Sequence, residues 1–132
     1  MSLSKELQLG KAGEHLVCFD LIMRGYNAFL ADQGLPFDIL IEKNGKLLKI
    51  QVRSTSQKRT YGKSKDIYRF GTRKGKGCIT RVRKAEVDYY AFVALDIKKI
   101  AYIPIKKMLA KTGKVKQTID LREKHYEKYK KI

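Results

Sequence analysis

The chain has 132 residues, which is enough for a buried core, and we expect a single domain over residues 1–132. Its 30 Lys and Arg residues against 13 Asp and Glu give a formal net charge of +17, and its hydrophobic content of 43% excludes a disordered chain. We find no apolar run long enough to cross a bilayer, so we expect a cytoplasmic protein without a membrane partner. A small chain with this charge is typical of proteins that bind a polyanion.

The first predicted element is a helix from about Ser4 to Arg24, which ends at Gly25. Two apolar stripes run along this helix, and the second contains a single charged residue, Glu14. A carboxylate against an apolar surface is costly unless it is paired or binds a metal, so Glu14 is a candidate ligand; an ion pair with a basic neighbour is the alternative. Gly10 and Gly13 indicate that a backbone or a phosphate comes close here. The first stripe is Leu9, Ala12, Leu16, Phe19 and Met23; the second is Leu7, Gly10, Glu14, Val17 and Leu21.

A hairpin follows, in which two alternating segments flank Asn44-Gly45. This dipeptide is the strongest short-range signal for a two-residue type I′ turn. In such a hairpin, residues whose numbers add up to 89 face each other, so Asp38 faces Gln51. Arg53 lies on the same face of the sheet, one step along the strand. An acid, an amide and a cation therefore share one patch, which suits a hard metal ion and a phosphate.

The rest of the chain is predicted from shorter runs. Residues 57–84 carry eleven Lys or Arg and one acid, Asp66, so this segment is the expected polyanion-binding surface. Packing on strands explains Tyr61, Tyr68 and Phe70 better than contacts to bases do. We expect strands at 26–31, 37–42, 47–53, 67–71, 87–95 and 100–105, a polar loop at 54–59, a short helix at 106–110 and a charged, weakly amphipathic tail at 121–132.

Three motifs occur in a fixed order: residues 10–14 (GKAGE) on the helix, 36–38 (PFD) before the first hairpin strand, and 51–53 (QVR) at the end of the second. Together they resemble the PD-(D/E)XK nuclease superfamily, whose core is a helix, a three-strand meander, a helix and a further strand. The glutamine at position 51 and the motifs at 87–89 (VDY) and 102–104 (YIP) are similar to the branch that contains intron-encoded homing endonucleases. The resemblance implies an α/β fold with a PD-(D/E)XK nuclease-like core, in which an N-terminal helix is followed by a mixed β-sheet with flanking helices.

The resemblance also implies roles for four residues. Glu14 positions a metal or its water, Asp38 is the central metal ligand, and Gln51 supplies a neutral oxygen. Arg53 occupies the family's lysine position, which orients water and stabilises the charge that develops on the phosphate. Two carboxylates and an amide oxygen suit Mg²⁺, and Mn²⁺ is a second metal that suits them. Arginine donates hydrogen bonds and charge but cannot shuttle a proton.

These inferences favour a metal-dependent endonuclease that cuts double-stranded DNA, of the sequence-specific homing type, and that acts as a homo-oligomer (dimer or tetramer) because one small domain reads few base pairs. Two alternatives use the same fold: a structure-specific nuclease that resembles the Holliday-junction resolvases, and a DNA-binding module without cleavage, which Arg53 favours. An RNA-binding protein of the ribosomal type does not explain Glu14 or the pairing of Asp38 with Gln51. The expected DNA contacts are Lys58, Arg59, Lys63, Lys65, Arg69, Arg73, Lys74, Lys76, Arg81 and Arg83.

Overall fold

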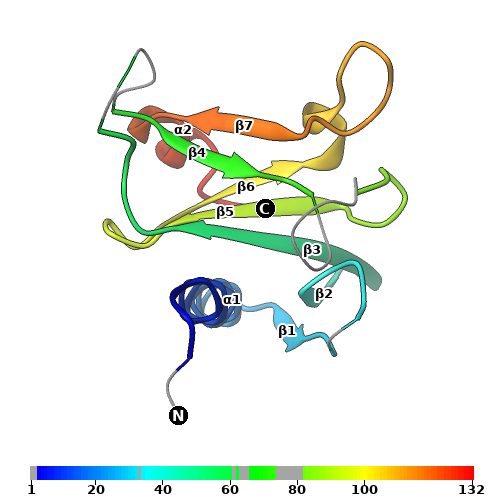
Figure 1. Cartoon of the computed structure of the whole chain (residues 1–132). Helices are drawn as coiled ribbons and strands as arrows, with labels where there is room; N and C mark the ends of the chain where they lie inside the picture. The colour runs from blue at the N-terminus through cyan, green and yellow to red at the C-terminus, as the bar shows by residue number, and fades with distance from the viewer. Residues whose placement is uncertain (1–2, 33, 61, 63–65, 74–81) are drawn as a thin grey trace.

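The computed structural model describes residues 3–32, 34–60, 62, 66–73 and 82–132. Five strands form a mixed sheet in the order β1-β2-β3-β5-β6, and β4 and β7 form a separate two-stranded sheet (Figure 1). The elements in chain order are α1 (Lys5–Met23), β1 (Asn27–Leu30), β2 (Ile39–Lys43), β3 (Lys46–Thr55), β4 (Tyr68–Gly71), β5 (Tyr89–Ala94), β6 (Lys99–Pro104), the 3₁₀ helix η2 (Ile105–Met108), β7 (Thr118–Leu121) and α2 (Glu123–Lys128).

The five-stranded sheet separates two apolar cores. Helix α1 covers one face, and the β4–β7 pair covers the other (Figure 1). Strand β5 serves both cores because successive side chains point to opposite faces: Ala91 and Val93 pack with α1, while Tyr90 and Phe92 pack with β4. The ring centroids of Phe92 and Phe70 are 5.0 Å apart. The expected mixed sheet is therefore present, but the cover on its second face is mostly a small sheet and not a helix.

Helix α1 confirms the first predicted element. Ser4 caps it, because the Ser4 hydroxyl accepts a hydrogen bond from the Leu7 N–H at 3.4 Å. It ends before Gly25, whose φ of +94° favours glycine. The second apolar stripe faces the sheet over its second half, where Val17 and Leu21 are fully buried, whereas Leu7 at its start is 55% exposed. The first stripe faces outward over its second half, where Phe19 and Met23 are largely exposed.

The predicted hairpin has the expected register, in which Ile39 pairs with Ile50 and Lys43 pairs with Lys46. Asn44 and Gly45 both have positive φ angles, 53° and 79°, as a type I′ turn requires. The expected end of the second strand was wrong, because β3 continues through Ser54 to Thr55. The extra length comes from parallel pairing with β5, which holds Thr55 opposite Ala94. A distant strand supplies these hydrogen bonds, so the local polar sequence does not break the strand.

The end of the chain differs most from expectation. The segment predicted as a charged tail contains part of β7 and the helix α2, and its Tyr126 is buried with 1% exposure. Strand β7 pairs with β4, with Tyr68 opposite Leu121, so a partner about 50 residues away decides this structure. The short helix expected at 106–110 is the 3₁₀ helix η2. Among the described residues, no helix is long and apolar enough to span a membrane.

Candidate active site

Asp38 lies where β2 begins, and two hydrogen bonds attach it to β3. Its N–H donates to the Ile50 carbonyl at 2.8 Å, one step beyond the last pair of the ladder. Its carboxylate Oδ2 accepts a hydrogen bond from the Val52 N–H, also at 2.8 Å. One oxygen of the Asp38 carboxylate is therefore held by the backbone of β3. The β3 backbone thus fixes the position of this side chain.

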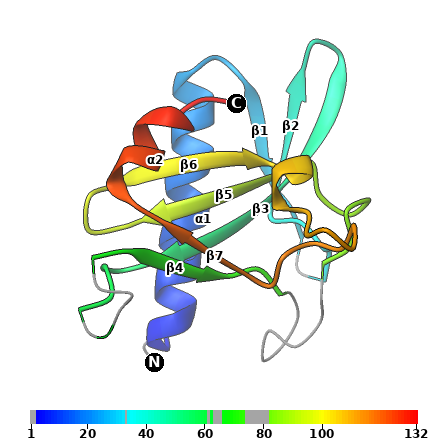
Figure 2. The same cartoon turned by 90° about the horizontal axis from the view of Figure 1, so that it is seen from above.

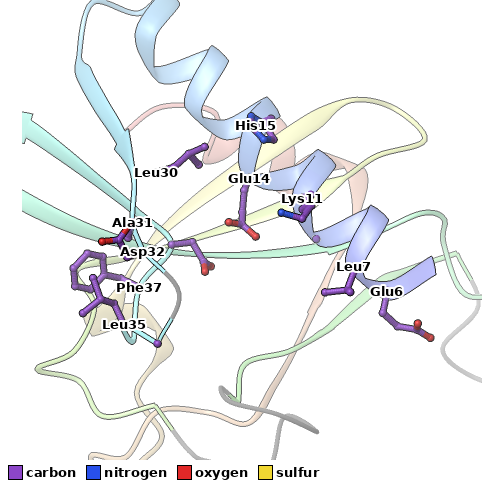
Figure 3. A pocket seen from close by; sticks show the side chains of 13 residues that line it. Glu6, Leu7, Lys11, Glu14, His15, Leu30, Ala31, Asp32, Leu35 and Phe37 are labelled. Carbon is purple, nitrogen blue, oxygen red and sulfur yellow. The ribbon is translucent and has the colours of Figure 1, made fainter. Parts of the chain in front are cut away.

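Glu14 approaches the same place from α1. Glu14 and Asp38 line one cavity of about 370 Å³ between the helix and the segment after β1 (Figure 3). Figure 3 shows the Glu14 side chain pointing away from α1, toward the segment that carries Asp32 and Phe37. Helix spacing places Lys11 one turn before Glu14, at the rim of the same cavity. Two carboxylates that are far apart in sequence therefore share one hollow.

The surroundings of Glu14 and Asp38 raise the pKa of both carboxylates. Burial raises the pKa of Glu14, and the charge of Asp38 raises it further, while Lys11 opposes the shift. Burial also raises the pKa of Asp38, against the hydrogen bond from Val52 and the charge of Arg53. Each carboxylate is thus less stable as an anion here than in water. A nearby cation would reverse this effect.

Gln51 and Arg53 lie on the opposite face of β3 from Ile50 and Val52. The Gln51 side chain is 7% exposed and lies beside Tyr90 of β5 in the parallel ladder. Arg53 is half-buried and lines a second cavity, of about 320 Å³, together with Gly10 and Ser54. Burial raises the pKa of both Asp38 and Tyr90, and the charge of Arg53 opposes each rise. In the hairpin register Asp38 lies opposite Gln51, so Asp38, Gln51 and Arg53 lie on one face of the sheet.

Tyr90 of β5 lies next to Gln51 in the parallel ladder, on the same face of the sheet. Burial raises its pKa to about 12, and the charge of Asp38 contributes to this shift. Its hydroxyl donates a hydrogen bond to the Thr72 carbonyl at 2.9 Å. Tyr90 thus packs on the β4 face of the sheet, beside Gln51, with its hydroxyl held by the Thr72 carbonyl.

Gly13 and Gly10, which precede Glu14 on α1, have different surroundings. A Cβ atom on Gly13 would lie 1.7 Å from the Ser54 hydroxyl, so glycine is needed for α1 to pack on β3. A Cβ atom on Gly10 would meet nothing within 4 Å. Gly10 instead lines both cavities, between the Glu14 side and the Arg53 side. A close approach does occur at Gly13, but the approaching group is the Ser54 side chain and not a backbone or a phosphate.

The donor set fits a hard divalent cation in part. In the part of the chain that the structure describes, no three His, Cys, Asp or Glu side chains converge as metal ligands. Glu14 and Asp38 supply two carboxylates, so further ligands have to be an amide such as Gln51, water or a substrate phosphate. Mg²⁺ is commonly bound in this way, through one or two carboxylates with the remaining positions filled by water and phosphate.

Several residues expected to contact DNA already have protein partners. Arg69 of β4 and Asp120 of β7 form a bidentate ion pair, in which Nε lies 2.7 Å from Oδ1 and Nη2 lies 2.9 Å from Oδ2. The Lys58 ammonium lies 2.5 Å from the Glu123 carboxylate. The Arg83 Nε lies 3.2 Å from the Glu86 carboxylate, and Arg73 donates a hydrogen bond to the Gln117 side chain. Arg59 is half-buried. The other predicted contacts lie outside the described residues: Lys63, Lys65, Lys74, Lys76 and Arg81.

The sequence interpretation missed three residues near the site: Lys11, Asp32 and Tyr90. Lys11 could have been found, because residues three apart on a helix are neighbours, and Glu14 had been singled out. Asp32 lines the Glu14 cavity from the segment after β1, and no local pattern connects it to Glu14. Tyr90 reaches Gln51 only through the parallel pairing of β3 with β5.

Comparisons with known proteins agree with this geometry. The sequence profile of the PD-(D/E)XK endonuclease family matches residues 4–132. The chain therefore belongs to the PD-(D/E)XK endonuclease family. The fold is similar to that of a solved bacterial homing endonuclease, I-Ssp6803I, with a TM-score of 0.70 and 16% sequence identity over 92% of this chain and 78% of that chain. No match is found among the curated proteins.

Proposed function

We propose that the chain is a metal-dependent endonuclease that hydrolyses phosphodiester bonds in double-stranded DNA. One observation carries the proposal: Glu14 and Asp38 come from separate elements, line one cavity, and have raised pKa values from burial, with repulsion from Asp38 adding to the shift at Glu14. Such a pair costs folding free energy unless a cation binds it. Membership of an endonuclease family supports this assignment.

In this proposal Glu14 and Asp38 hold Mg²⁺ or Mn²⁺, and the Gln51 amide oxygen adds a neutral ligand. When bound, the metal supplies an activated water and neutralises charge on the phosphate. The Val52 N–H keeps Asp38 in place through Oδ2. Arg53 donates hydrogen bonds to the scissile phosphate and keeps its own proton.

We further propose that the substrate is a specific duplex sequence, bound by a homo-oligomer. The structural neighbour is a homing endonuclease, and the positive charge of this chain suits the phosphate backbone of DNA. Of the predicted contacts, Arg69 and Lys58 would have to exchange an acidic partner for a phosphate. The four side chains of these ion pairs are 32–58% exposed, and ion pairs at the surface contribute little free energy, so such an exchange costs little.

Asp38→Asn tests the proposal more sharply than alanine does. Asparagine keeps an oxygen that can accept the Val52 hydrogen bond, whereas alanine would leave that N–H unpaired at a cost of about 1–3 kcal/mol. We expect Asp38→Asn to lose metal-dependent plasmid cleavage and to bind DNA at least as tightly as the wild type, because a negative charge is removed. Glu42→Gln is the matched control, since Glu42 is exposed on β2 and the charge change is the same.

The substrate is tested with the same protein. A duplex library should yield cleavage at a preferred sequence, and a four-way junction of arbitrary sequence should not be cut preferentially. Preferential cutting of the junction would favour the structure-specific nuclease. Binding without metal-dependent nicking of any substrate would favour the non-cleaving DNA-binding module, for which Arg53 in the lysine position is the supporting observation.

A further inference from the structure

Gly10 is a glycine that the packing of this chain does not require. It lies in the interior of α1, where glycine destabilises a helix relative to alanine. It is not one of the glycines with a positive φ angle, and a Cβ atom built on it would meet nothing within 4 Å. Gly13, by contrast, has a packing reason in the Ser54 side chain. A glycine without a packing reason indicates close approach by a group that is not part of the chain.

The space beside Gly10 is open. Residues 3–8 are exposed, and the first turns of α1 extend past the strands of the large sheet (Figure 2). Gly10 lines the cavity of about 370 Å³ together with Glu14 and Asp38. It also lines the cavity of about 320 Å³ together with Arg53. A ligand that occupies both cavities therefore lies on the backbone of Gly10. Because Gly10 and Glu14 are four residues apart, they share one face of α1, separated by about 6 Å along its axis.

The residues next to Gly10 suit a sugar–phosphate backbone. Lys11 lines the first cavity, and its charge opposes the rise in the pKa of Glu14 that burial causes. Figure 3 shows the Lys11 and Glu14 side chains on the edge of α1 that borders the cavity. Leu7 also lines this cavity, three residues before Gly10, and is 55% exposed. The ammonium group is suited to bind a phosphate, and the leucine is suited to pack against the apolar face of a deoxyribose.

We propose that the DNA strand to be cut crosses α1 at Gly10, with a phosphate on Lys11 and a sugar against Leu7; this rests on the proposed function for the identity of the ligand. We call Leu7, Gly10 and Lys11 the strand seat. Because Gly10 has no Cβ atom, the strand comes into van der Waals contact with the helix backbone. The scissile phosphate then reaches the Glu14–Asp38 pair one helical turn further along.

The acids around the strand seat determine how closely a polyanion approaches it. In the proposed function, a metal ion neutralises Glu14 and Asp38. Asp32 lies across the first cavity, in the segment after β1. Glu6 is exposed and lines both cavities, and Figure 3 shows its carboxylate directed away from Glu14. Its charge remains beside the strand seat and should weaken the binding of DNA there.

The first test measures cleavage of plasmid DNA under single-turnover conditions. Gly10→Ala and Gly10→Leu add a side chain where the chain has open space, and both residues are better helix formers than glycine. Both variants should therefore have a higher thermal midpoint than the wild type. Both should nevertheless cut more slowly, Gly10→Leu by about a hundredfold, because a displacement of the substrate by about 1 Å can cost this much. A purely structural role for Gly10 would instead couple a loss of activity to a loss of stability.

Ala12→Leu is the matched control for added bulk. Ala12 is exposed on α1, and residues two apart on a helix do not share a face, so this variant should cut at the rate of the wild type. A Gly10→Leu variant that is folded and cuts at the rate of the wild type would overturn the strand seat and leave the proposed nuclease intact.

The second test measures only the affinity for one short duplex, in the Asp38→Asn protein, which should leave the DNA uncut. Lys11→Gln should weaken binding about two- to fivefold, as expected for one exposed ionic contact, and more than Lys46→Gln in the hairpin turn does. Glu6→Gln should strengthen binding, and more than Glu42→Gln does. Equal effects within each pair would overturn the strand seat. If the wild type cuts no DNA, the proposed function fails, and these two comparisons still decide where the strand lies.

Discussion

At the scale of single residues, the site is a place where the protein gives up stability. Glu14 and Asp38 are carboxylates partly removed from water, and the charge of one adds to the burial that raises the pKa of the other. A fold selected for stability alone would have an apolar or amide side chain at one of these positions. The cost is understandable if both charges are needed to bind a cation.

Glu14→Gln should expose this cost as a pH dependence. The folded-state pKa of Glu14 lies above its ordinary value of 4.5, so between the two values the folded protein binds more protons than the unfolded chain. Stability therefore falls as pH rises through this window. Without metal, the unfolding free energy of Glu14→Gln should exceed that of the wild type by an amount that grows as pH increases from about 4.5. Urea denaturation at several pH values measures this difference, and a difference that is constant with pH would contradict the assignment.

Arg53 poses a separate question about charge and shape. Its charge favours the ionised form of Asp38, and lysine would keep that charge in a more compact, rotatable group. We expect Arg53→Lys to keep or raise the cleavage rate, and Arg53→Gln, which removes the charge, to lower it. Single-turnover kinetics on one DNA substrate compares the three proteins. A fall of more than about tenfold in Arg53→Lys, roughly 1.4 kcal/mol of barrier, would show that the planar guanidinium itself is required.

At the scale of elements, the site depends on how closely α1 approaches β3. Glu14 reaches Asp38 only because Gly13, the residue before it, lets the helix rest on Ser54. The hydroxyl of Ser54 is buried there without a hydrogen-bond partner among the described residues. The contact between α1 and β3 at Gly13 thus positions the carboxylate of the next residue, Glu14.

Gly13→Ala should destabilise the protein, although alanine is the better helix former. The gain in helix propensity is about 1 kcal/mol, and overpacking typically costs about 1–3 kcal/mol. The new Cβ would lie 1.7 Å from the Ser54 hydroxyl, so we expect the cost to win and the thermal midpoint to fall. Gly10→Ala, where a Cβ has open space, should raise it. The pair Gly13→Ala, Ser54→Gly should recover part of the loss, and equal stabilisation by both alanines would show that the helix does not rest on β3 as described.

At the scale of the whole molecule, residues 1–47 carry a net charge of −1 and residues 48–132 a net charge of +18, so the second segment should decide how DNA binding responds to salt. Each phosphate that Lys or Arg neutralises lowers log K by about 0.9 per log unit of salt. In this second segment, Lys84 and Lys114 lie with Arg83 around a cavity of about 290 Å³, and Lys111, close to Lys114 in sequence, is exposed.

Replacing Lys84, Lys111 and Lys114 with alanine should therefore reduce the slope of log K against log salt by the contribution of up to about three phosphate contacts. The triple variant Lys5→Ala, Lys43→Ala, Lys46→Ala removes the same charge from the near-neutral third of the chain. It should leave the slope close to that of the wild type. A salt titration of affinity for one duplex compares the three proteins, and equal slopes for the two variants would mean that total charge, and not its location, governs binding.

Local sequence was sufficient to predict the elements that carry the proposed site residues. The capped helix and the Asn44-Gly45 hairpin were predictable, because helix caps, type I′ turns and side-chain alternation depend on residues close in the chain. The same local rules placed Asp38 beside β3 and Gln51 and Arg53 on one face. They also placed Glu14 on the inward side of α1.

Tertiary structure alone decided which of these residues meet. The parallel pairing of β3 with β5 extends β3 and brings Tyr90 beside Gln51. The pairing of β4 with β7 converts an apparent tail into part of the core. The cavity that joins Glu14 to Asp38 also includes Asp32 from another segment. These contacts join residues far apart in the chain, where the free energy comes from packing and long-range hydrogen bonds, and no short window of sequence contains both partners.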